Sequence, residues 1–510
     1  MAEQADATDL KSVLRLTGGA GSTPALGTPF DLPMPDLENL KLAYNPRAIA
    51  IVGASEKSDA RWQGAVFIKN LRKAGYQGPI YPVNPNAQDI LGLKVYPSLI
   101  SLPKPVDLAI VSVSCSNSLS VMEDCAAAGI KNIHFFTAGF SETGEEEGKA
   151  LEARLKELAL KNGINLVGPN CMGINVPSAG VVILQGVKVP AGPVAFISQS
   201  GGHCLQLCHY APSAGIGFSK VISFGNAAVL DSTDYLETMK EDGETGIFAL
   251  YVEGVRDGRR FFRLVREINR SSPVIVWKGG MTSPGSRAAL SHTGSLAGDR
   301  EKWEAFYRQT GAIEVVSLDE LADTIMTLLY LKSAPGNGVA LLMGGGGHSV
   351  TAADFCGREG LEVPLLGEET RRELRKLVAA AGTSIRNPID AEILLRDMNL
   401  FEKALVAISA DPRVDIIIVD QHLDMLKEMG KDNIERFGSA ILKQARGHSG
   451  AKGIAVLMET WGGDSDVAAE RVRLQKEFLK NGVPVYRTLP RACRALSKYL
   501  NYREFIRRGS

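Results

Sequence analysis

The sequence predicts an α/β fold made of three doubly wound domains in tandem. At three places a short, continuously apolar run leads into a Gly- or Ser-rich loop and then a helical pattern. The runs start at Ile49, Val194 and Val339, so both intervals are 145 residues long. Such runs are typical of strands buried on both faces of a parallel sheet. Because a domain takes about 100–200 residues, the spacing favours one doubly wound domain per interval.

Composition excludes several classes of protein. The 510 residues include 57 Lys+Arg and 57 Asp+Glu, so a neutral chain offers no electrostatic footprint for nucleic acid or an acidic membrane. No apolar run reaches the ~20 residues of a membrane span, and the first 40 residues lack a secretory signal. The seven cysteines are scattered, with no CxxC pair, so neither a disulfide framework nor a metal site is expected. We expect a cytoplasmic enzyme.

Pro- and Gly-rich stretches suggest the domain boundaries. We expect a flexible N-terminal arm over 1–39 and domains over 40–180, 190–332 and 336–510. Apolar runs alternate with helical patterns inside each domain. The expected further strands are 80–83, 108–113, 133–136 and 166–167, then 221–224, 247–252 and 274–277, then 416–419 and 453–457. The basic end, 491–508, has helical spacing and predicts a solvated final helix.

The first candidate site follows the strands of the first domain. Gly53, Ala54 and Ser55 close its first strand, where a nucleotide phosphate would meet the next helix N-terminus. They do not form GxGxxG, since serines occupy the third and sixth positions, so NAD is disfavoured. A tight turn without a ligand remains an alternative. Residues 81–85 and 137–140 also follow strands, which places three loops at the carboxyl edge where open sheets bind ligands.

The second candidate site lies at the start of a predicted helix. Residues 198–202, Ser-Gln-Ser-Gly-Gly, offer hydroxyls and unhindered backbone N–H groups. Such a helix start suits a phosphate or an acyl phosphate. A serine nucleophile of the Gly-x-Ser-x-Gly type is an alternative, although Ser198 stands where that motif needs its first glycine.

Among the histidines, His292 has distinctive surroundings. It lies in a polar segment, 278–298, which we predict to be a long Gly/Ser loop presenting the imidazole. With no second His or Cys at metal-ligand spacing, a nucleophile or proton shuttle is favoured over a ligand. His203 and His348 follow glycine loops and remain alternatives for ligand contact. Glu253 directly follows a strand, so its carboxylate is placed to orient one imidazole nitrogen and leave the other free.

Taken together, these segments resemble the α subunit of the ADP-forming acyl-CoA synthetases of the acetate–CoA ligase type, within the succinyl-CoA synthetase superfamily. The matching segments are 45–55, 78–85, 106–109, 137–142, 168–173, 198–201, 224–226, 251–254, 291–298, 344–347 and 387–390. The order is right from about residue 40 onward. The sequence departs from the family at Asn86, where Lys is common, and in the turns 112–115 and 227–229.

The resemblance implies a role for each domain. A Rossmann-like domain would bind CoA, and two flavodoxin-like CoA-ligase domains would follow. The residues nearest the nucleotide of CoA would be Gly53, Ala54, Ser55, Asn84, Thr137 and Gly139. The second domain would carry the phosphorylated His292, oriented by Glu253, and the phosphoryl group would rest on Ser200, Gly201 and Gly202. The third would brace the phosphate loop and contact a partner subunit.

The resemblance also implies a reaction: acyl-CoA, phosphate and ADP give acid, CoA and ATP, reversibly, through an acyl phosphate and a phosphohistidine. No Walker A motif is present, and three ligase-type domains occupy the chain. A separate ATP-grasp β subunit binding Mg²⁺ with ADP or ATP is therefore expected, in an αβ or α₂β₂ assembly. Two alternatives stay open, a non-catalytic CoA- or acyl-CoA-binding regulatory protein and a Rossmann oxidoreductase. The carboxylic acid, the physiological direction and ADP versus GDP are not determined by the sequence.

Overall fold

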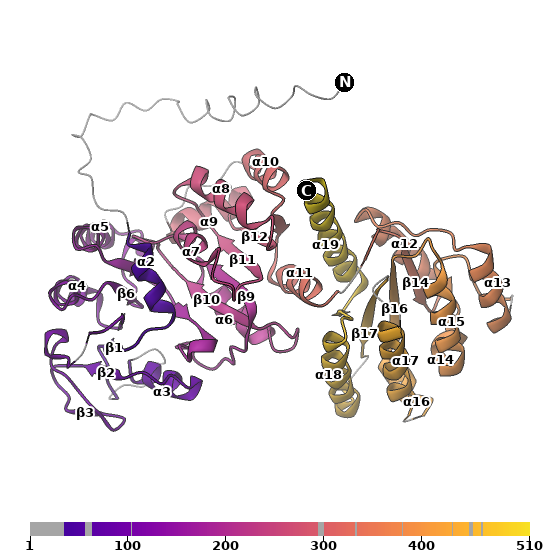
Figure 1. Cartoon of the computed structure of the whole chain (residues 1–510), viewed down its shortest axis with the longest axis horizontal. Coiled ribbons are helices and arrows are strands. Elements are labelled where there is room, and N and C mark those ends of the chain that lie inside the picture. Colours follow the sequence, from indigo (N-terminus) through magenta and orange to yellow (C-terminus); the bar gives the residue numbers. More distant parts are fainter. Residues whose placement is uncertain are drawn as a thin grey trace, which may run out of the picture. The chain divides into compact units, whose positions relative to one another are not determined.

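Three parallel sheets, each flanked by helices, form the described part of the chain (Figure 1). The computed structural model describes residues 35–56, 64–103, 105–293, 300–331, 334–379, 381–430, 432–447, 452–460 and 463–509, without the side chains of 289–293 and 459. The predicted tandem of doubly wound α/β units is confirmed. No helix in these residues is long and apolar enough to cross a membrane.

The first sheet has the order β2-β1-β5-β6-β7, all parallel. Its strands are β1 (Ile49–Val52), β2 (Ile80–Val83), β5 (Leu108–Val111), β6 (Asn132–Phe135) and β7 (Asn165–Val167). Its main helices are α2 (Leu37–Leu40), α3 (Gly64–Ala74), α4 (Ser118–Ala127) and α5 (Glu146–Lys161). Short 3-10 turns are η1 (Lys41–Tyr44), η2 (Leu99–Ser101), η3 (Cys115–Asn117), η4 (Ser141–Thr143) and η5 (Pro177–Ala179), and β3 (Asp89–Ile90) pairs with β4 (Leu93–Lys94).

The second sheet repeats this order and gains an edge strand. Strands β9 (Ala191–Ser198), β10 (Phe218–Ser223), β11 (Ile247–Val252), β12 (Val274–Lys278) and β13 (Ile313–Val315) are parallel. β8 (Gly173–Asn175) pairs with β10 in the antiparallel sense, so residues that precede position 180 complete the second sheet. The helices are α6 (Gly201–Tyr210), α7 (Ser232–Met239), α8 (Gly258–Ile268), α9 (Ser283–Thr293), α10 (Arg300–Thr310) and α11 (Leu318–Tyr330).

The third sheet has the order β15-β14-β16-β17-β18, which is again the 2-1-3-4-5 order of flavodoxin-like folds. Its strands are β14 (Val339–Met343), β15 (Ile389–Asp390), β16 (Ile416–His422), β17 (Gly453–Glu459) and β18 (Val485–Tyr486). Its helices are α12 (Gly346–Arg358), α13 (Glu368–Leu377), α14 (Glu392–Arg396), α15 (Met398–Ala410), α16 (Leu423–Glu428), α17 (Asn433–Gly447), α18 (Ser465–Lys480) and α19 (Leu489–Gly509).

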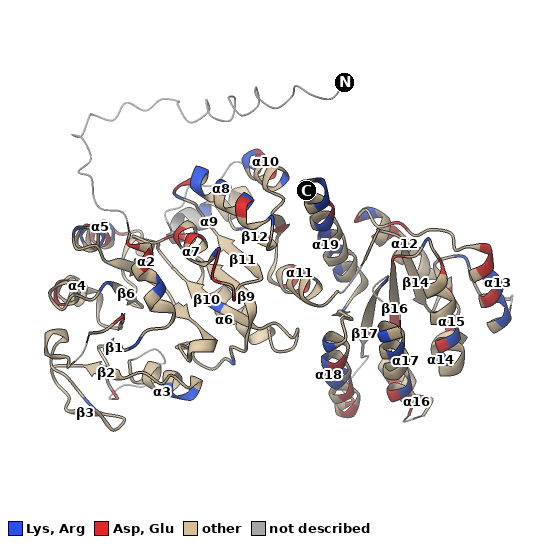
Figure 2. Cartoon of the chain, in the orientation of Figure 1, with Lys and Arg blue, Asp and Glu red and all other residues tan. Residues whose placement is uncertain are grey.

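The strands are buried on both faces, as their continuous apolar runs predict. Alternate residues of β9 and β11 enter two different cores, because successive side chains of a strand point to opposite faces. One of these cores also contains the first sheet, so the first two sheets share a continuous hydrophobic core. Figure 2 shows charged residues of both signs on the helices, whereas most strand residues are uncharged.

The final helix differs from the expected solvated one. The side chains of Cys493, Leu496 and Tyr499 on α19 are buried in the same core as residues of α11 and β14. Arg491 Nε and Nη2 donate to the two carboxylate oxygens of Asp323 at 2.6 and 2.9 Å. The many basic residues of this helix obscured the apolar pattern of its other face in the sequence. That apolar face packs against α11 and α12.

We expect Gly53→Ala to destabilise the protein more than Gly75→Ala. Both glycines have a positive φ, +82° and +88°, so each alanine carries a backbone penalty of ~1–2 kcal/mol. At Gly53 a Cβ would also lie 2.3 Å from the carbonyl oxygen of Ser112, whereas Gly75 has open space. The clash should add ~1–3 kcal/mol to the loss in unfolding free energy, measured by urea denaturation. An equal loss in both variants would contradict this packing argument.

Candidate functional site

A cavity of about 460 Å³ lies where loops from the first two sheets meet. The loops that line it follow the carboxyl ends of β5, β6, β9 and β10, and one more segment precedes β8. Its lining residues are 112–115, 136–138, 170–172, 199–202, Gly225 and Asn226. Ligands of open α/β sheets bind at this edge, so the cavity is the candidate site.

The cavity brings together some of the residues predicted from sequence. Thr137 from the first unit and Ser200, Gly201 and Gly202 from the second all line it. Gly139 lies next to it, because Cys115 of the lining donates its Sγ–H to the Gly139 carbonyl at 3.0 Å.

The loop after β1 lies one layer away from the cavity. Gly53 packs directly against Ser112, which does line the cavity, but Gly53, Ala54 and Ser55 are not themselves among the lining residues. The Asn84 Nδ2 donates to the Ala54 carbonyl at 2.7 Å, and its Oδ1 accepts from the Asn86 backbone at 2.8 Å. Asn84 therefore holds the β1 and β2 loops together at a separate corner of the same edge.

Helix α6 starts at the cavity, and its first two residues, Gly201 and Gly202, line that cavity. Ser200 is the N-cap, and its hydroxyl accepts from the His203 backbone N–H at 3.3 Å. The next two residues are glycines: the Met172 side chain packs against Gly201, whereas Gly202 is exposed and carries no side chain of its own. Orphan N–H groups and the helix dipole together favour an anion at such a position.

Glu253 is buried at the end of β11, with 7% of its surface exposed. Its backbone N–H donates to Gln199 Oε1 at 2.7 Å, and its Oε1 accepts from the Tyr251 hydroxyl at 3.1 Å. Burial, and then the nearby Glu253 charge, raise the pKa of Tyr251 above its usual value. Burial lowers the pKa of Lys278 at the end of β12, while the Glu253 carboxylate opposes that shift. Gln199 lines the cavity and bonds the Glu253 backbone, whereas Glu253 itself is not among the lining residues.

The segment carrying His292 contains a helix instead of the predicted long loop. α9 runs from Ser283 to Thr293, and the His292 side chain lies outside the described residues. The Thr282 hydroxyl accepts from the Gly285 N–H at 3.2 Å, as an N-cap does, and Pro284 stands in the first turn, where its missing N–H costs nothing. This helix lies against η4 of the first unit.

Two carboxylates and one amide connect the two halves of the cavity, and sequence reasoning missed all three. Asn226 Nδ2 donates to Glu142 Oε2 at 2.6 Å and to Glu152 Oε2 at 2.8 Å. Glu142 in turn accepts from the backbone N–H groups of Gly139 and Phe140 at 2.6 and 3.1 Å. The loop after β6 is thus held by a residue from the second sheet. Conspicuous Gly-Asn and Phe-Ser-Glu segments marked these positions, but nothing in the sequence paired them.

Two other histidines, His203 and His348, were candidates for ligand contact. The His203 ring stacks on Trp277 at a centroid distance of 4.5 Å and meets Tyr251 edge-on at 4.4 Å, so it is held in an aromatic cluster. His348 is exposed at the start of α12. In the part of the chain that the structure describes, no three His, Cys, Asp or Glu side chains gather as metal ligands do.

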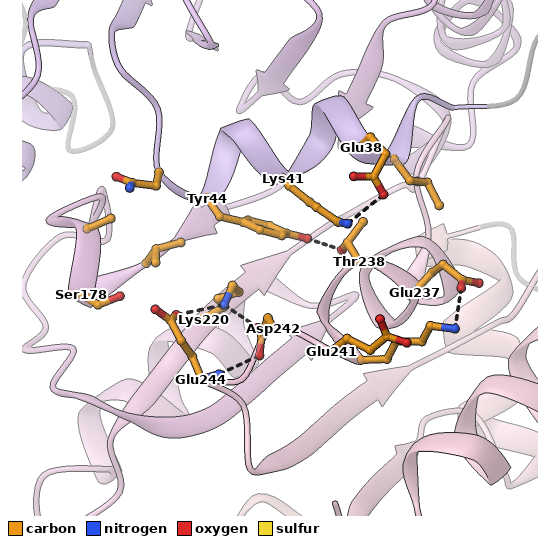
Figure 3. Close-up of a pocket in the computed structure, with 15 residues that line it drawn as sticks. Glu38, Lys41, Tyr44, Ser178, Lys220, Glu237, Thr238, Glu241, Asp242 and Glu244 are labelled. Atoms are coloured by element: carbon orange, nitrogen blue, oxygen red, sulfur yellow. Dashed lines mark hydrogen bonds and ion pairs between the residues drawn. The ribbon is translucent and has the colours of Figure 1, made fainter.

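A second cavity, of about 650 Å³, contains none of the predicted site residues (Figure 3). It lies between η1 and α7, and its lysines are already paired. Lys220 contacts Asp242 and Glu244 at 2.7 and 3.3 Å, and Lys41 contacts Glu38 at 2.8 Å. The lysines that line this cavity therefore already have carboxylate partners.

Comparisons with known proteins identify two domains of the chain. Residues 47–177 match a CoA binding domain and 191–328 a succinyl-CoA ligase like flavodoxin domain. The chain is 39% identical to the acetate–CoA ligase [ADP-forming] II subunit alpha of Pyrococcus furiosus, over 74% of this chain and 80% of that one. It is similar in structure to the dinucleotide forming acetyl-coenzyme A synthetase 1 of Ca. Korarchaeum cryptofilum, with a TM-score of 0.76 and 31% identity over 92% of this chain and 98% of that one.

The acetate–CoA ligase [ADP-forming] I of Archaeoglobus fulgidus is 36% identical over 89% of this chain, but the match spans 62% of that protein's length. These similarities place the protein in a class of CoA-binding ligases with succinyl-CoA ligase-like domains. The chain belongs to the ADP-forming acetate–CoA ligase family and is similar to its α subunits.

We expect the His134→Gln variant to lose less stability on acidification than the parent protein. His134 lies in β6 beneath the cavity residue Cys171, and burial lowers its pKa to about 4. The unfolded state, with a pKa of about 6.5, takes up a proton that the folded state excludes as the pH falls toward 4. Above pH ~6.5 this proton uptake does not affect the free energy of unfolding. Near pH 4 it lowers the free energy of unfolding by ~3 kcal/mol. Urea denaturation between these pH values measures both slopes, and identical slopes would contradict the assignment.

Proposed function

We propose that the chain is the α subunit of a nucleoside-diphosphate-forming acid–CoA ligase. The reversible reaction is acyl-CoA, phosphate and ADP to acid, CoA and ATP. The observation that carries the proposal is the shared cavity, which joins loops of a CoA-binding unit to the N-terminus of α6. A thioester and a phosphate brought to such a place would be held close to one another in one cavity.

CoA would extend from the first unit, proposed as residues 40–180, into the cavity. The loops of Gly53, Ala54, Ser55 and Asn84 would contact its nucleotide, and the loop of Thr137 and Gly139 would guide the thiol end. This order follows the chain's layout, since Gly53 abuts Ser112 and Ser112 lines the cavity. The second and third units, proposed as 190–332 and 336–510, would carry the phosphoryl chemistry and the brace for the partner.

The chemistry divides into an acyl transfer followed by in-line phosphoryl transfers. A phosphate oxygen attacks the thioester carbonyl carbon; a C–O bond forms as the C–S bond breaks, and CoA leaves as a thiolate. An imidazole nitrogen of His292 then attacks phosphorus, and the carboxylic acid leaves as its carboxylate. The first N–H groups of α6 would stabilise the phosphoryl oxygens, and Glu253 would stabilise the cationic imidazole that forms.

The last step would occur on another subunit. We propose an ATP-grasp β subunit, in an αβ or α₂β₂ assembly, that passes the phosphoryl group from His292 to ADP. The P. furiosus relative is itself named a subunit alpha. Mg²⁺ bound with the nucleotide would offset the charge of the phosphates there.

His292→Ala should abolish phosphorylation of the chain. With the partner, Mg²⁺ and radiolabelled ATP, the parent protein should acquire an acid-labile label, because a phosphoramidate bond hydrolyses in acid. His209→Ala, on the exposed face of α6, is the matched control and should label fully. Label that persists in His292→Ala would remove His292 from the mechanism.

Glu253→Gln should slow phosphorylation by about 10- to 100-fold and leave CoA affinity unchanged. The amide keeps the size of the side chain but loses the charge that stabilises the imidazolium. Single-turnover labelling and calorimetric CoA titration measure the two effects. Glu241→Gln, an exposed carboxylate at the second cavity, is the control. Normal labelling in Glu253→Gln would show that this carboxylate is structural.

A further inference from the structure

Gln199 lines the cavity, and only the oxygen of its side-chain amide is bonded to the described part of the protein. It follows β9 and precedes the N-cap of α6, and only 6% of its surface is exposed. It lines the cavity beside Ser200 and Gly201. No earlier step of the proposed reaction uses its side chain.

The backbone determines which way the Gln199 amide faces. Its Oε1 accepts from the backbone N–H groups of Glu253 at 2.7 Å and of Gly254 at 3.2 Å. A nitrogen in that position would face two donors, so the oxygen must occupy it. The Nε2 consequently points the other way. Within the described residues it has no hydrogen-bond acceptor, and it is not among the side-chain atoms enclosed by protein.

Several other side-chain donors around the cavity are already bonded to protein groups. Thr137 donates to the Val113 carbonyl at 2.9 Å, and Asn170 Nδ2 donates to Asn226 Oδ1 at 3.3 Å. Asn226 Nδ2 is bound by Glu142 and Glu152. The Nε2 of Gln199 thus stands beside the α6 N-terminus as a side-chain donor ready for a ligand.

We propose that Gln199 Nε2 donates a hydrogen bond to an oxygen of the phosphoryl group, supplied by inorganic phosphate or by the acyl phosphate. The inference rests on the proposed function, because that function brings phosphate to this cavity. Gln199 lines the cavity and its Nε2 is not enclosed by protein, so a phosphoryl oxygen beside the first turn of α6 could accept a charge-assisted hydrogen bond from it. Gln199 is then a phosphate-binding residue that also holds the backbone of Glu253 through Oε1.

Gln199→Glu separates the two roles of this side chain. A glutamate keeps an oxygen for the Glu253 and Gly254 N–H groups, but it loses the donor and brings a negative charge toward the phosphate. Gln199→Met removes both the donor and the acceptor without adding charge. Gln206→Glu, on the exposed face of α6, is the matched control for the added charge.

The measurement is calorimetric titration of the full chain with inorganic phosphate, and separately with acetyl phosphate. Both Gln199 variants should bind the phosphoryl probe at least about tenfold more weakly, the effect of losing a hydrogen bond to a charged group. Gln206→Glu should bind as the parent does. Parent-like affinity for both probes in Gln199→Glu would overturn the proposal, because it would show that the residue only clamps the strand ends. A loss with one probe supports the proposal and identifies the source of the phosphoryl group.

Two further measurements distinguish a failure of this proposal from misfolding of a variant and from a failure of the proposed function. CoA affinity, which depends on the first unit, reports whether each variant is folded; if Gln199→Glu is not, parent-like phosphate affinity in Gln199→Met overturns the proposal. Histidine labelling of the parent chain tests the function independently. If the parent binds phosphate through Gln199 but never forms phosphohistidine, the proposed function fails and the binding role stands.

Discussion

The close approach of two backbone segments, residues 168–170 and 224–228, determines the shape of the candidate site. A Cβ atom on Gly225 would lie 2.3 Å from the carbonyl oxygens of Pro169 and Asn170, so glycine alone lets the two segments touch. The Asn226 backbone then donates to Pro169 at 3.1 Å, and its side chain reaches Glu142. Because this contact joins loops of two sheets, the CoA-binding half and the helix α6 half form one cavity.

Uncharged residues line that cavity, and the nearby buried charged residues are not among the lining residues. The lining residues include the first residues of α6 and Gln199. The buried charges of Glu253 and Lys278 lie behind them, at the ends of β11 and β12. An anion would therefore meet dipoles before it met a carboxylate. A buried charge is tolerated here because it is hydrogen-bonded, as Glu253 is to Tyr251.

Sequence patterns predicted the architecture well where one physical signal dominated. Continuous apolar runs located β1, β2, β11 and β14 closely, because a strand covered on both faces has no polar position to blur its limits. Short strands such as β8 and β15 were missed, since two or three residues carry too little pattern. α9 was mistaken for a loop because its serines and glycines outweighed the cap at Thr282, and α19 was mistaken for a solvated helix because of its basic residues.

The sequence by itself determined three tandem α/β units, the glycine- and serine-rich loops at their strand ends, and the residue types suited to phosphate chemistry. These properties are local, because periodicity and turn residues act over a few neighbours. Only the tertiary structure decided that Asn226 binds Glu142 and Glu152, and that Gln199 Oε1 accepts from the backbone of Glu253. Those contacts join residues some 50 to 85 positions apart, and no local pattern encodes which strand ends become neighbours when the sheets pack.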